Sequence, residues 1–213
     1  MVEVRAQRAS KPRVFLASAN AKKITEMQRI LAEHVPDIEV LGIDDVDGYV
    51  EPVEDQPTFE GNALLKARAG VAATGLPSIA DDSGLCVDAL NGMPGVLSAR
   101  WSGQPKSDKR NNALLLDQLD DVPDERRGAH FACAVAWVMP DGRERVVEGR
   151  MDGRIIREVR GSGGFGYDVV FVAVEHDADG LTSAELDPAE KDRISHRGRA
   201  LRELAPQVAA DLS

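Results

Sequence analysis

Residues 13–34 read RVFLASANAKKITEMQRILAEH, and this stretch joins two different hydrophobic patterns. The run RVFLAS is short and apolar, which is typical of a buried β-strand. In the following segment Ile24, Met27, Ile30 and Leu31 recur at helical spacing, so we expect a helix directly after the strand. A strand that leads into an amphipathic helix indicates an α/β protein.

The rest of the chain continues this alternation and predicts an α/β fold with a mixed central sheet flanked by helices. The segment PTFEGNALLKARAGVAATG indicates a second helix that begins after Thr58 as N-cap and ends at Gly75. Gly61 stands where a capping box would place Glu, which weakens that helix start. The other expected elements are strands at 76–80, 130–139, 145–156 and 167–174 and a closing helix at 194–212.

Length and composition suit one large domain. The 213 residues include 43% apolar side chains, which is enough for a sizeable core. We expect a single domain over residues 13–213, preceded by a flexible extension at residues 1–12. Cys86 and Cys133 lie in apolar contexts without a CxxC motif or paired histidines, which argues against a zinc site or a disulfide.

Charge and hydropathy exclude several kinds of partner. The formal net charge of −10 argues against a polymeric nucleic acid, because a phosphate backbone is bound mainly through Lys and Arg. No apolar stretch approaches the roughly 20 residues of a membrane span. The first residues, MVEVRAQRASKP, lack the apolar core of a signal peptide. We therefore expect a cytoplasmic protein without a membrane partner.

The junction between the first strand and helix has the features of an anion site. Asn20 is a good N-cap, and Lys22 and Lys23 occupy the first turn, where the helix dipole makes a cation slightly unfavourable. A bound anion would offset this cost, since exposed amides and two ammonium groups would converge on it. The alternative is a pair of solvated lysines.

A second unusual feature is the pair Asp81 and Asp82, which follows an apolar run and precedes Ser83 and Gly84. Adjacent carboxylates repel each other, so we expect positive charge beside them. Glu54 could join the pair to hold Mg²⁺ through oxygen ligands. An Asx turn or N-cap at DDSG, and an ordinary acidic loop around Glu54, are the structural alternatives.

The segment GSGGFGYD (161–168) resembles a dinucleotide-binding loop only superficially. Such a loop follows a strand and opens a helix, whereas this segment leads into an expected strand. A glycine-rich turn that brings the backbone close to a ligand is the better interpretation, with Phe165 or Tyr167 as a flat face for a base. A plain structural turn is the alternative.

Further donors lie near the C-terminus and on the second helix. His196 and Arg197 in SHRG, with Lys191 just before them, can donate hydrogen bonds to a carbonyl-bearing base or a phosphate. Solvated charges at a helix start would explain the same pattern. Lys66 and Arg100 do not stand out singly.

In combination, these motifs resemble the Ham1-like, or inosine triphosphate pyrophosphatase, family. The resemblance runs from about Arg13 to the C-terminus, and the order and approximate spacing of the motifs make it specific. Gly61 departs from the glutamate that many relatives place within FxENA. The motifs are SANAKK (18–23), Glu54 with TFEGNALLKA (58–67), IADDSGL (79–85), NGMPG with SAR (91–100), GGFGYD (163–168) and Lys191 with SHRG (195–198).

The resemblance implies an active site in a cleft between two lobes, with Asp82 as catalytic residue and metal ligand. Glu54 is similar to a second ligand of Mg²⁺. Triphosphate contacts are implied for Ser18, Asn20, Lys23, Lys66 and Arg100, a substrate contact for Ser83, and nucleoside recognition for Phe165, Gly166, Tyr167, Asp168, Lys191, His196 and Arg197.

By this resemblance the protein hydrolyses non-standard purine nucleoside triphosphates (ITP, dITP, XTP) to the monophosphate and pyrophosphate. It is expected to form a homodimer. A Maf-like nucleotide pyrophosphatase with another base preference and a purine-nucleotide sensor without hydrolytic activity are the alternatives. Whether Asp81 raises the proton affinity of Asp82 more than a metal lowers it stays open.

Overall fold

The centre of the fold is one curled, mixed β-sheet. In the computed structural model, which describes residues 11–212, six strands pair in the order β2-β1-β3-β4-β5-β6. β1 is parallel to both of its neighbours, and the pairs from β3 to β6 are antiparallel. This confirms the predicted mixed sheet. The strands are β1 (Arg13–Leu16), β2 (Glu39–Leu41), β3 (Ser78–Val87), β4 (Gly128–Val138), β5 (Glu144–Ile155) and β6 (Phe171–Ala173).

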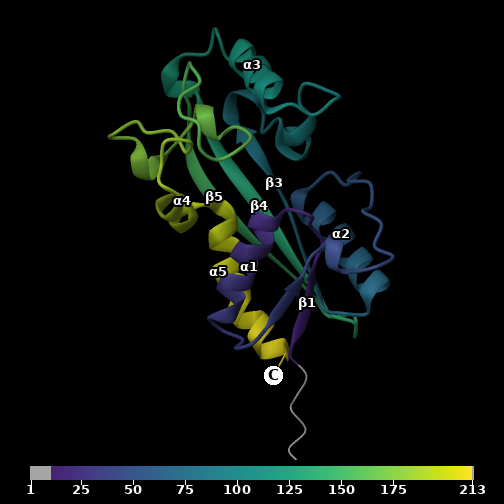
Figure 1. Ribbon diagram of the computed structural model, residues 1–213. Helices are drawn as coiled ribbons and strands as arrows, with labels where there is room; N and C mark the ends of the chain where they lie inside the picture. Colours follow the sequence, from purple (N-terminus) through teal and green to yellow (C-terminus); the bar gives the residue numbers. More distant parts are fainter. Residues whose placement is uncertain (1–10, 213) are drawn as a thin grey trace, which may run out of the picture.

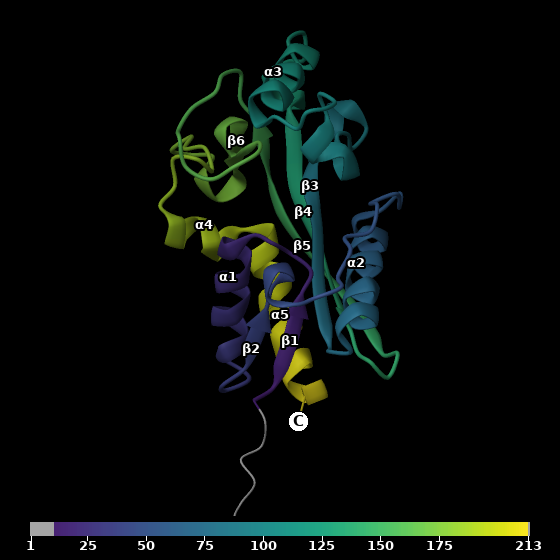
Figure 2. The same ribbon diagram turned by 45° about the vertical axis from the view of Figure 1, so that its right-hand side comes forward.

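Helices cover both faces of this sheet. Helices α1 and α5 lie side by side on one face, and α2 packs on the other (Figures 1 and 2). As predicted, the Thr58 hydroxyl caps α2 by accepting the Gly61 N–H at 3.0 Å, and α2 ends at Gly75 with a left-handed φ of 66°. The helices are α1 (Ala21–Ala32), α2 (Phe59–Thr74), α3 (Asp108–Gln118), α4 (Pro188–Ile194) and α5 (His196–Leu212).

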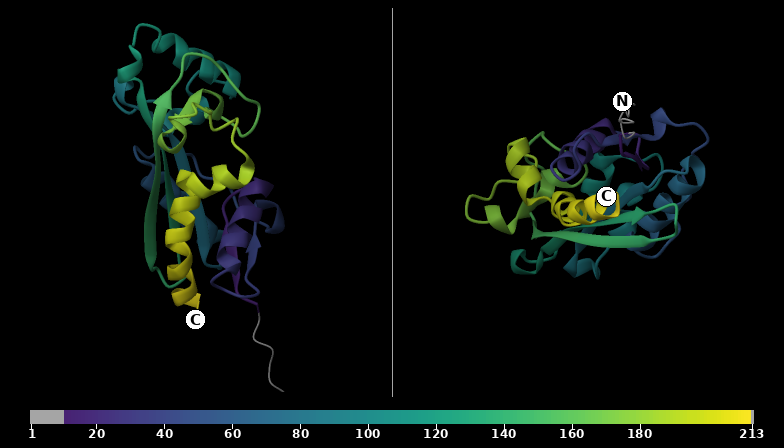
Figure 3. Two further views of the ribbon diagram at one scale, coloured as in Figure 1. Left: turned by 90° about the vertical axis from the view of Figure 1, so that its left-hand side faces the viewer. Right: turned by 90° about the horizontal axis from the view of Figure 1, so that it is seen from below.

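The long strands β3, β4 and β5 connect two lobes (Figure 3). One lobe holds α1, α2 and α5, and the other holds α3 and the loops around β6 (Figure 2). Each lobe has its own apolar core on the same face of the sheet: Trp137 and Leu201 belong to the first, and Phe131 and Phe171 to the second. The alanine-rich face of α2, with Ala63 and Ala67, packs on the opposite face.

Three predicted boundaries are wrong. β3 does not end at residue 80 but continues to Val87, so both aspartates lie inside the strand. Only Phe171–Ala173 of the predicted strand 167–174 is extended, because residues 168–170 form a 3₁₀ turn. The closing helix divides at Ser195, whose φ and ψ of −61° and 145° are extended.

Two other predictions concern the ends of the chain and its environment. The predicted flexible extension at residues 1–12 lies almost wholly outside the described residues, and its behaviour stays a prediction. Within residues 11–212, no helix combines the length and apolar character needed to cross a bilayer.

Candidate active site

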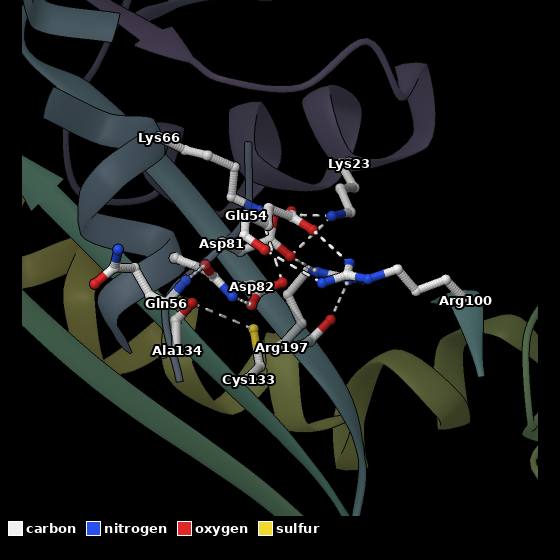
Figure 4. Close-up of polar contacts among 12 residues, drawn as sticks. Lys23, Glu54, Gln56, Lys66, Asp81, Asp82, Arg100, Cys133, Ala134 and Arg197 are labelled. Atoms are coloured by element: carbon white, nitrogen blue, oxygen red, sulfur yellow. Dashed lines mark hydrogen bonds and ion pairs between the residues drawn. The ribbon is translucent and has the colours of Figure 1, made fainter. Parts of the chain in front are cut away.

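The two aspartates of β3 point to opposite faces of the sheet. Successive side chains alternate along a strand, so Asp81 and Ser83 face α1 and α5, whereas Asp82 faces α2. The pairing of β1 with β3 ends at Leu16–Ile79, so this polar stretch lies on β3 beyond the end of β1. The alternation separates the like charges that make the sequence look unusual (Figure 4).

Asp81 is held by two cations from distant parts of the chain. Lys23 Nζ lies 2.9 Å from both carboxylate oxygens, and Arg197 Nε donates to Oδ2 at 3.1 Å. The residue is 6% exposed. Burial alone would raise the pKa of Asp81, but the charges of Lys23 and Arg197 outweigh it and hold the pKa far below its usual range. The expectation of positive charge beside the aspartates is confirmed.

Asp82 has a different environment on the α2 face. Asn62 Nδ2 donates to Oδ2 at 2.9 Å, and Lys66 Nζ lies 3.7 Å from Oδ1. Burial raises the pKa of Asp82 above its ordinary value, Lys66 and Asn62 oppose this rise, and the carboxylates of Glu54 and Asp81 add to it. Asp82 is thus a more basic carboxylate than an exposed one.

Glu54 points at the same ammonium group as Asp82. Its Oε1 accepts from Lys66 Nζ at 2.8 Å, and Oε2 lies 3.5 Å from Arg100 Nη1. Burial would raise the pKa of Glu54, but the bond from Lys66 and the charge of Arg100 lower it overall. Lys66, predicted to contact phosphate, therefore lies buried between two carboxylates.

Glu54 and Asp82 offer carboxylate oxygens, the type of ligand that a hard cation such as Mg²⁺ prefers. Among residues 11–212 there is no group of three His, Cys, Asp or Glu side chains able to hold a metal ion. Mg²⁺, however, commonly takes one or two protein carboxylates and completes its octahedron with phosphate oxygens and water. Glu54 and Asp82, which already converge on one cation, fit that pattern when a phosphate is bound.

Beside this cluster lies a cleft of about 570 Å³ between the two lobes. Ser18, Lys66, Arg100, Glu54 and Asp82 do not line it. Ser18 lies at the edge of the α1 start, where its Oγ accepts the Asn20 N–H at 3.1 Å. The other four form the cluster described above, in which Asp82 directly precedes the cleft residue Ser83 along β3. The predicted residues that do line the cleft are Asn20, Lys23, Ser83, Phe165, Gly166, Tyr167, Asp168, Lys191, His196 and Arg197.

The glycine-rich loop forms one wall of the cleft as a turn, not as a dinucleotide fingerprint. Asp168 accepts the Phe165 N–H at 2.8 Å and also binds Lys191 Nζ. Gly164 has a φ of 72°, and a Cβ there would lie 2.2 Å from the Asp168 carboxylate, so glycine is required. Lys191 Nζ lies 5.1 Å from the Phe165 ring centre.

Of the two aromatic rings proposed for stacking, only Phe165 is exposed, at 60%. Tyr167 is 4% exposed, belongs to the second apolar core, and donates its hydroxyl to the Ser98 carbonyl oxygen at 2.9 Å. Tyr167 also lines the cleft, so its use as a flat face for a base stays a prediction, and Phe165 is the ring that the structure exposes.

His196 and Arg197 do begin the last helix, but they do not form a free basic cluster. His196 stacks on Phe131, with ring centres 5.0 Å apart and planes 10° from parallel. Burial and the charge of Arg197 lower the pKa of His196 to about 3, so its ring is neutral and carries one N–H. Arg197 binds Asp81 and, through Nη2 at 3.4 Å, the Ser83 hydroxyl.

Several site residues were missed in the sequence. Asn62 is the one that a signal could have revealed, because it lies one helical turn before Lys66 on the same helix. Phe131, Glu26 and Asp108 also line the cleft. They come from segments with no distinctive motif, and only the fold brings them to the site.

The fold and this cleft define a two-lobed α/β protein with paired cations and carboxylates in and beside the cleft. The chain belongs to the Ham1 family, whose model matches residues 14–207. This family assignment decides against the Maf-like alternative.

Named relatives cover nearly the whole chain. A dITP/XTP pyrophosphatase of Nocardia farcinica is 60% identical over 93% of this chain and 95% of its own length. The crystal structure of a nucleoside-triphosphatase, or dITP/XTP pyrophosphatase, from Mycobacterium abscessus is 54% identical with a TM-score of 0.76, over 91% of this chain and 99% of that one. A HAM1 protein structure from Coxiella burnetii is 38% identical with a TM-score of 0.85, over 93% and 99%.

Proposed function

We propose that this protein hydrolyses non-standard purine nucleoside triphosphates, namely ITP, dITP and XTP, to the nucleoside monophosphate and pyrophosphate. The relatives named dITP/XTP pyrophosphatase support this activity. The observation that carries it is the position of Asp82, a carboxylate of raised pKa that adjoins the cleft and lies within 3.7 Å of a buried ammonium group.

Asp82 is the proposed general base. It takes a proton from the water that attacks phosphorus, and a carboxylate with a raised pKa does this better than an ordinary one. The Asn62 amide holds one carboxylate oxygen, which leaves Oδ1 for the water. The bond between the α-phosphorus and the oxygen that bridges it to the β-phosphorus then breaks, and pyrophosphate leaves.

The cations of the site are proposed to change partners when substrate binds. Lys23 is paired with Asp81, and Lys66 and Arg100 with Glu54. A triphosphate carries more charge than either carboxylate and competes for these groups. Their charge then stabilises the negative charge that builds up on the departing pyrophosphate. Ser18 and Asn20 complete the phosphate contacts at the start of α1.

Mg²⁺ is the proposed cofactor, with Glu54 and Asp82 as its protein ligands. When bound, it would neutralise phosphate charge and make phosphorus more electrophilic. Since the protein supplies two carboxylates, we expect the ion to bind together with the nucleotide.

Base selection is assigned to Phe165, His196 and Arg197. Phe165 offers its exposed ring for stacking. The Nη1 group of Arg197, which its two contacts do not use, and the single N–H of neutral His196 are donors suited to a carbonyl at C6. Adenine presents an amino group there, and two facing donors cost about 1–3 kcal/mol, equivalent to a preference of about ten- to a hundredfold. Lys191 and Asp168 hold the loop that carries the ring.

The decisive experiment is a substrate panel. Purified protein is incubated with Mg²⁺ and each of ITP, dITP, XTP, ATP and GTP, and pyrophosphate release is measured. Rapid release from the first three and slow release from the others is the expected result. Binding without release would favour the sensor, and equal rates with all five would refute the proposed selectivity.

The proposal includes four further properties. Residues 13–213 act as a single domain, and the enzyme is a homodimer, for which a light-scattering mass of one chain would be the contrary result. The substrates belong to the cytoplasmic nucleotide pool, so we expect the protein there. Neither a polymeric nucleic acid nor a membrane is expected as a partner.

A further inference from the structure

Asn62 is a fully buried polar residue at the start of α2, with 0% exposure. Both ends of its side-chain amide are used. Nδ2 donates to Asp82 Oδ2 at 2.9 Å, and Oδ1 accepts the Gln56 backbone N–H at 3.0 Å. A carboxylate can only accept and a backbone N–H can only donate, so these partners fix the orientation of the amide.

These two hydrogen bonds join separate parts of the site. Asp82 is on β3, whereas Gln56 lies two residues after Glu54 in the segment that leads to α2. One side chain therefore ties the proposed base to the segment that carries the second carboxylate. Figure 4 shows Gln56, Glu54 and Asp82 in the same part of the site.

Two residues of α2 contact different oxygens of the Asp82 carboxylate. Asn62 and Lys66 are four residues apart, so they lie on one face of the helix and both reach the carboxylate. Asn62 occupies Oδ2, and Lys66 Nζ lies 3.7 Å from Oδ1. The Asn62 amide is neutral, so it fixes the carboxylate through a hydrogen bond and adds no positive charge beside it.

Gly61 packs closely against the segment that contains Gln56. A Cβ at position 61 would lie 2.8 Å from the Gln56 Cβ, closer than real Cβ contacts allow. The absence of a side chain lets the segment of Gln56 approach the helix start, where its N–H meets Asn62. The glycine at the capping-box position thus has a packing reason.

We propose that Asn62 is a positioning residue, which orients the Asp82 carboxylate for proton transfer and holds the Glu54 segment against α2. This inference rests on the proposed function of Asp82. It assigns to Asn62 no contact with substrate. The loss of a group that orients a catalytic or ligating side chain typically lowers activity about 10- to 100-fold.

Two substitutions of Asn62 distinguish the effects of its two hydrogen bonds. Asn62→Leu removes both, while the isosteric Asn62→Asp keeps an acceptor for Gln56 but turns a carboxylate toward Asp82. We expect kcat for XTP to fall about 10- to 100-fold in both variants, with KM within about threefold of wild type. Hydrogen exchange of the Gln56 amide should accelerate in Asn62→Leu and stay slow in Asn62→Asp.

Gln28→Met is the matched control. Gln28, on α1, is also a carboxamide with both ends hydrogen-bonded: it donates to the Ile38 carbonyl oxygen at 2.7 Å and accepts the Val40 N–H at 2.9 Å, and neither partner belongs to the site around Asp82. Its loss should lower the melting temperature and leave kcat unchanged. An equal fall of kcat in the control would overturn the positioning role, because general destabilisation would then explain both variants.

Asp82→Asn distinguishes failure of the inference from failure of the proposed function. If this variant is inactive while Asn62→Leu keeps kcat within twofold of wild type, the positioning role is refuted and the function stands. If Asp82→Asn remains active, the proposed base is wrong and the inference fails with it. A raised KM with unchanged kcat in Asn62→Leu would instead indicate a substrate contact and refute the assignment.

Discussion

Replacing His196 by phenylalanine should weaken the dependence of folding stability on pH. The ring of His196 stacks on Phe131 and lies near the charges of Arg197, Lys191, Lys23 and Asp81. Burial and Arg197 lower its pKa from 6.5 to about 3. Below pH 6.5 the unfolded chain therefore binds a proton at this position that the folded protein does not, so stability falls as pH falls.

The size of the effect follows from these two pKa values. At pH 5, preferential protonation of the unfolded chain lowers the free energy of unfolding by about 2 kcal/mol, and at pH 7 by about 0.2 kcal/mol. The difference depends little on the folded value, because any pKa well below 5 leaves the folded ring neutral at pH 5. Wild type should thus lose about 2 kcal/mol more than His196→Phe between pH 7 and pH 5.

Urea unfolding of both proteins at several pH values between 7 and 5 measures this difference. The other titrating groups are common to both proteins and cancel, and phenylalanine keeps an aromatic ring beside Phe131. Parallel stability curves, with a difference of less than about 0.5 kcal/mol, would show that His196 protonates normally in the fold. The argument from burial would then be wrong.

Other predictions concern catalysis. Asp82→Asn should lower kcat by about 10²-fold or more and leave binding of the triphosphate, measured by calorimetry, largely intact. Lys23→Ala should raise KM and lower kcat; unchanged kinetics would mean that Lys23 serves only Asp81. Arg197→Ala should reduce the ITP to ATP ratio of kcat/KM about ten- to a hundredfold, whereas a flat ratio would point to a phosphate contact. Chelation with EDTA should stop pyrophosphate release and added Mg²⁺ should restore it, and activity that persists in EDTA would contradict the proposed cofactor.

Local signals were sufficient for much of the fold. The α2 boundaries follow from Thr58 and Gly75, whose capping roles depend on neighbouring residues alone. The end of β3 was predicted wrongly because it depends on contacts with residues far away in the sequence. Adjacent aspartates interrupt an apolar run, and the cations that make them tolerable inside a strand come from α1 and α5, far away in the sequence.

The site shows the same limit. The motifs identified most residues of the cleft, because each motif is a local segment. Their states of charge and partners were not predictable. His196 of α5 is neutral because it is buried against Phe131 of β4, and Lys66 is buried between carboxylates because a loop and β3 meet there. Such properties arise from burial, which periodicity alone does not specify.

Because side chains alternate along β3, the active site is sensitive to whether an odd or an even number of residues is inserted into this strand or deleted from it. Asp81 serves the face of α1 and α5, and Asp82 serves the face of α2. An insertion or deletion of a single residue between Ser78 and Asp81 would exchange the faces of every later side chain in the strand while leaving the composition almost unchanged. An insertion of two residues would keep each later side chain on its own face of the sheet and should therefore be tolerated better than an insertion of one. Length variation in the family should therefore accumulate in the loops before and after β3, and the number of residues within the strand should stay constant.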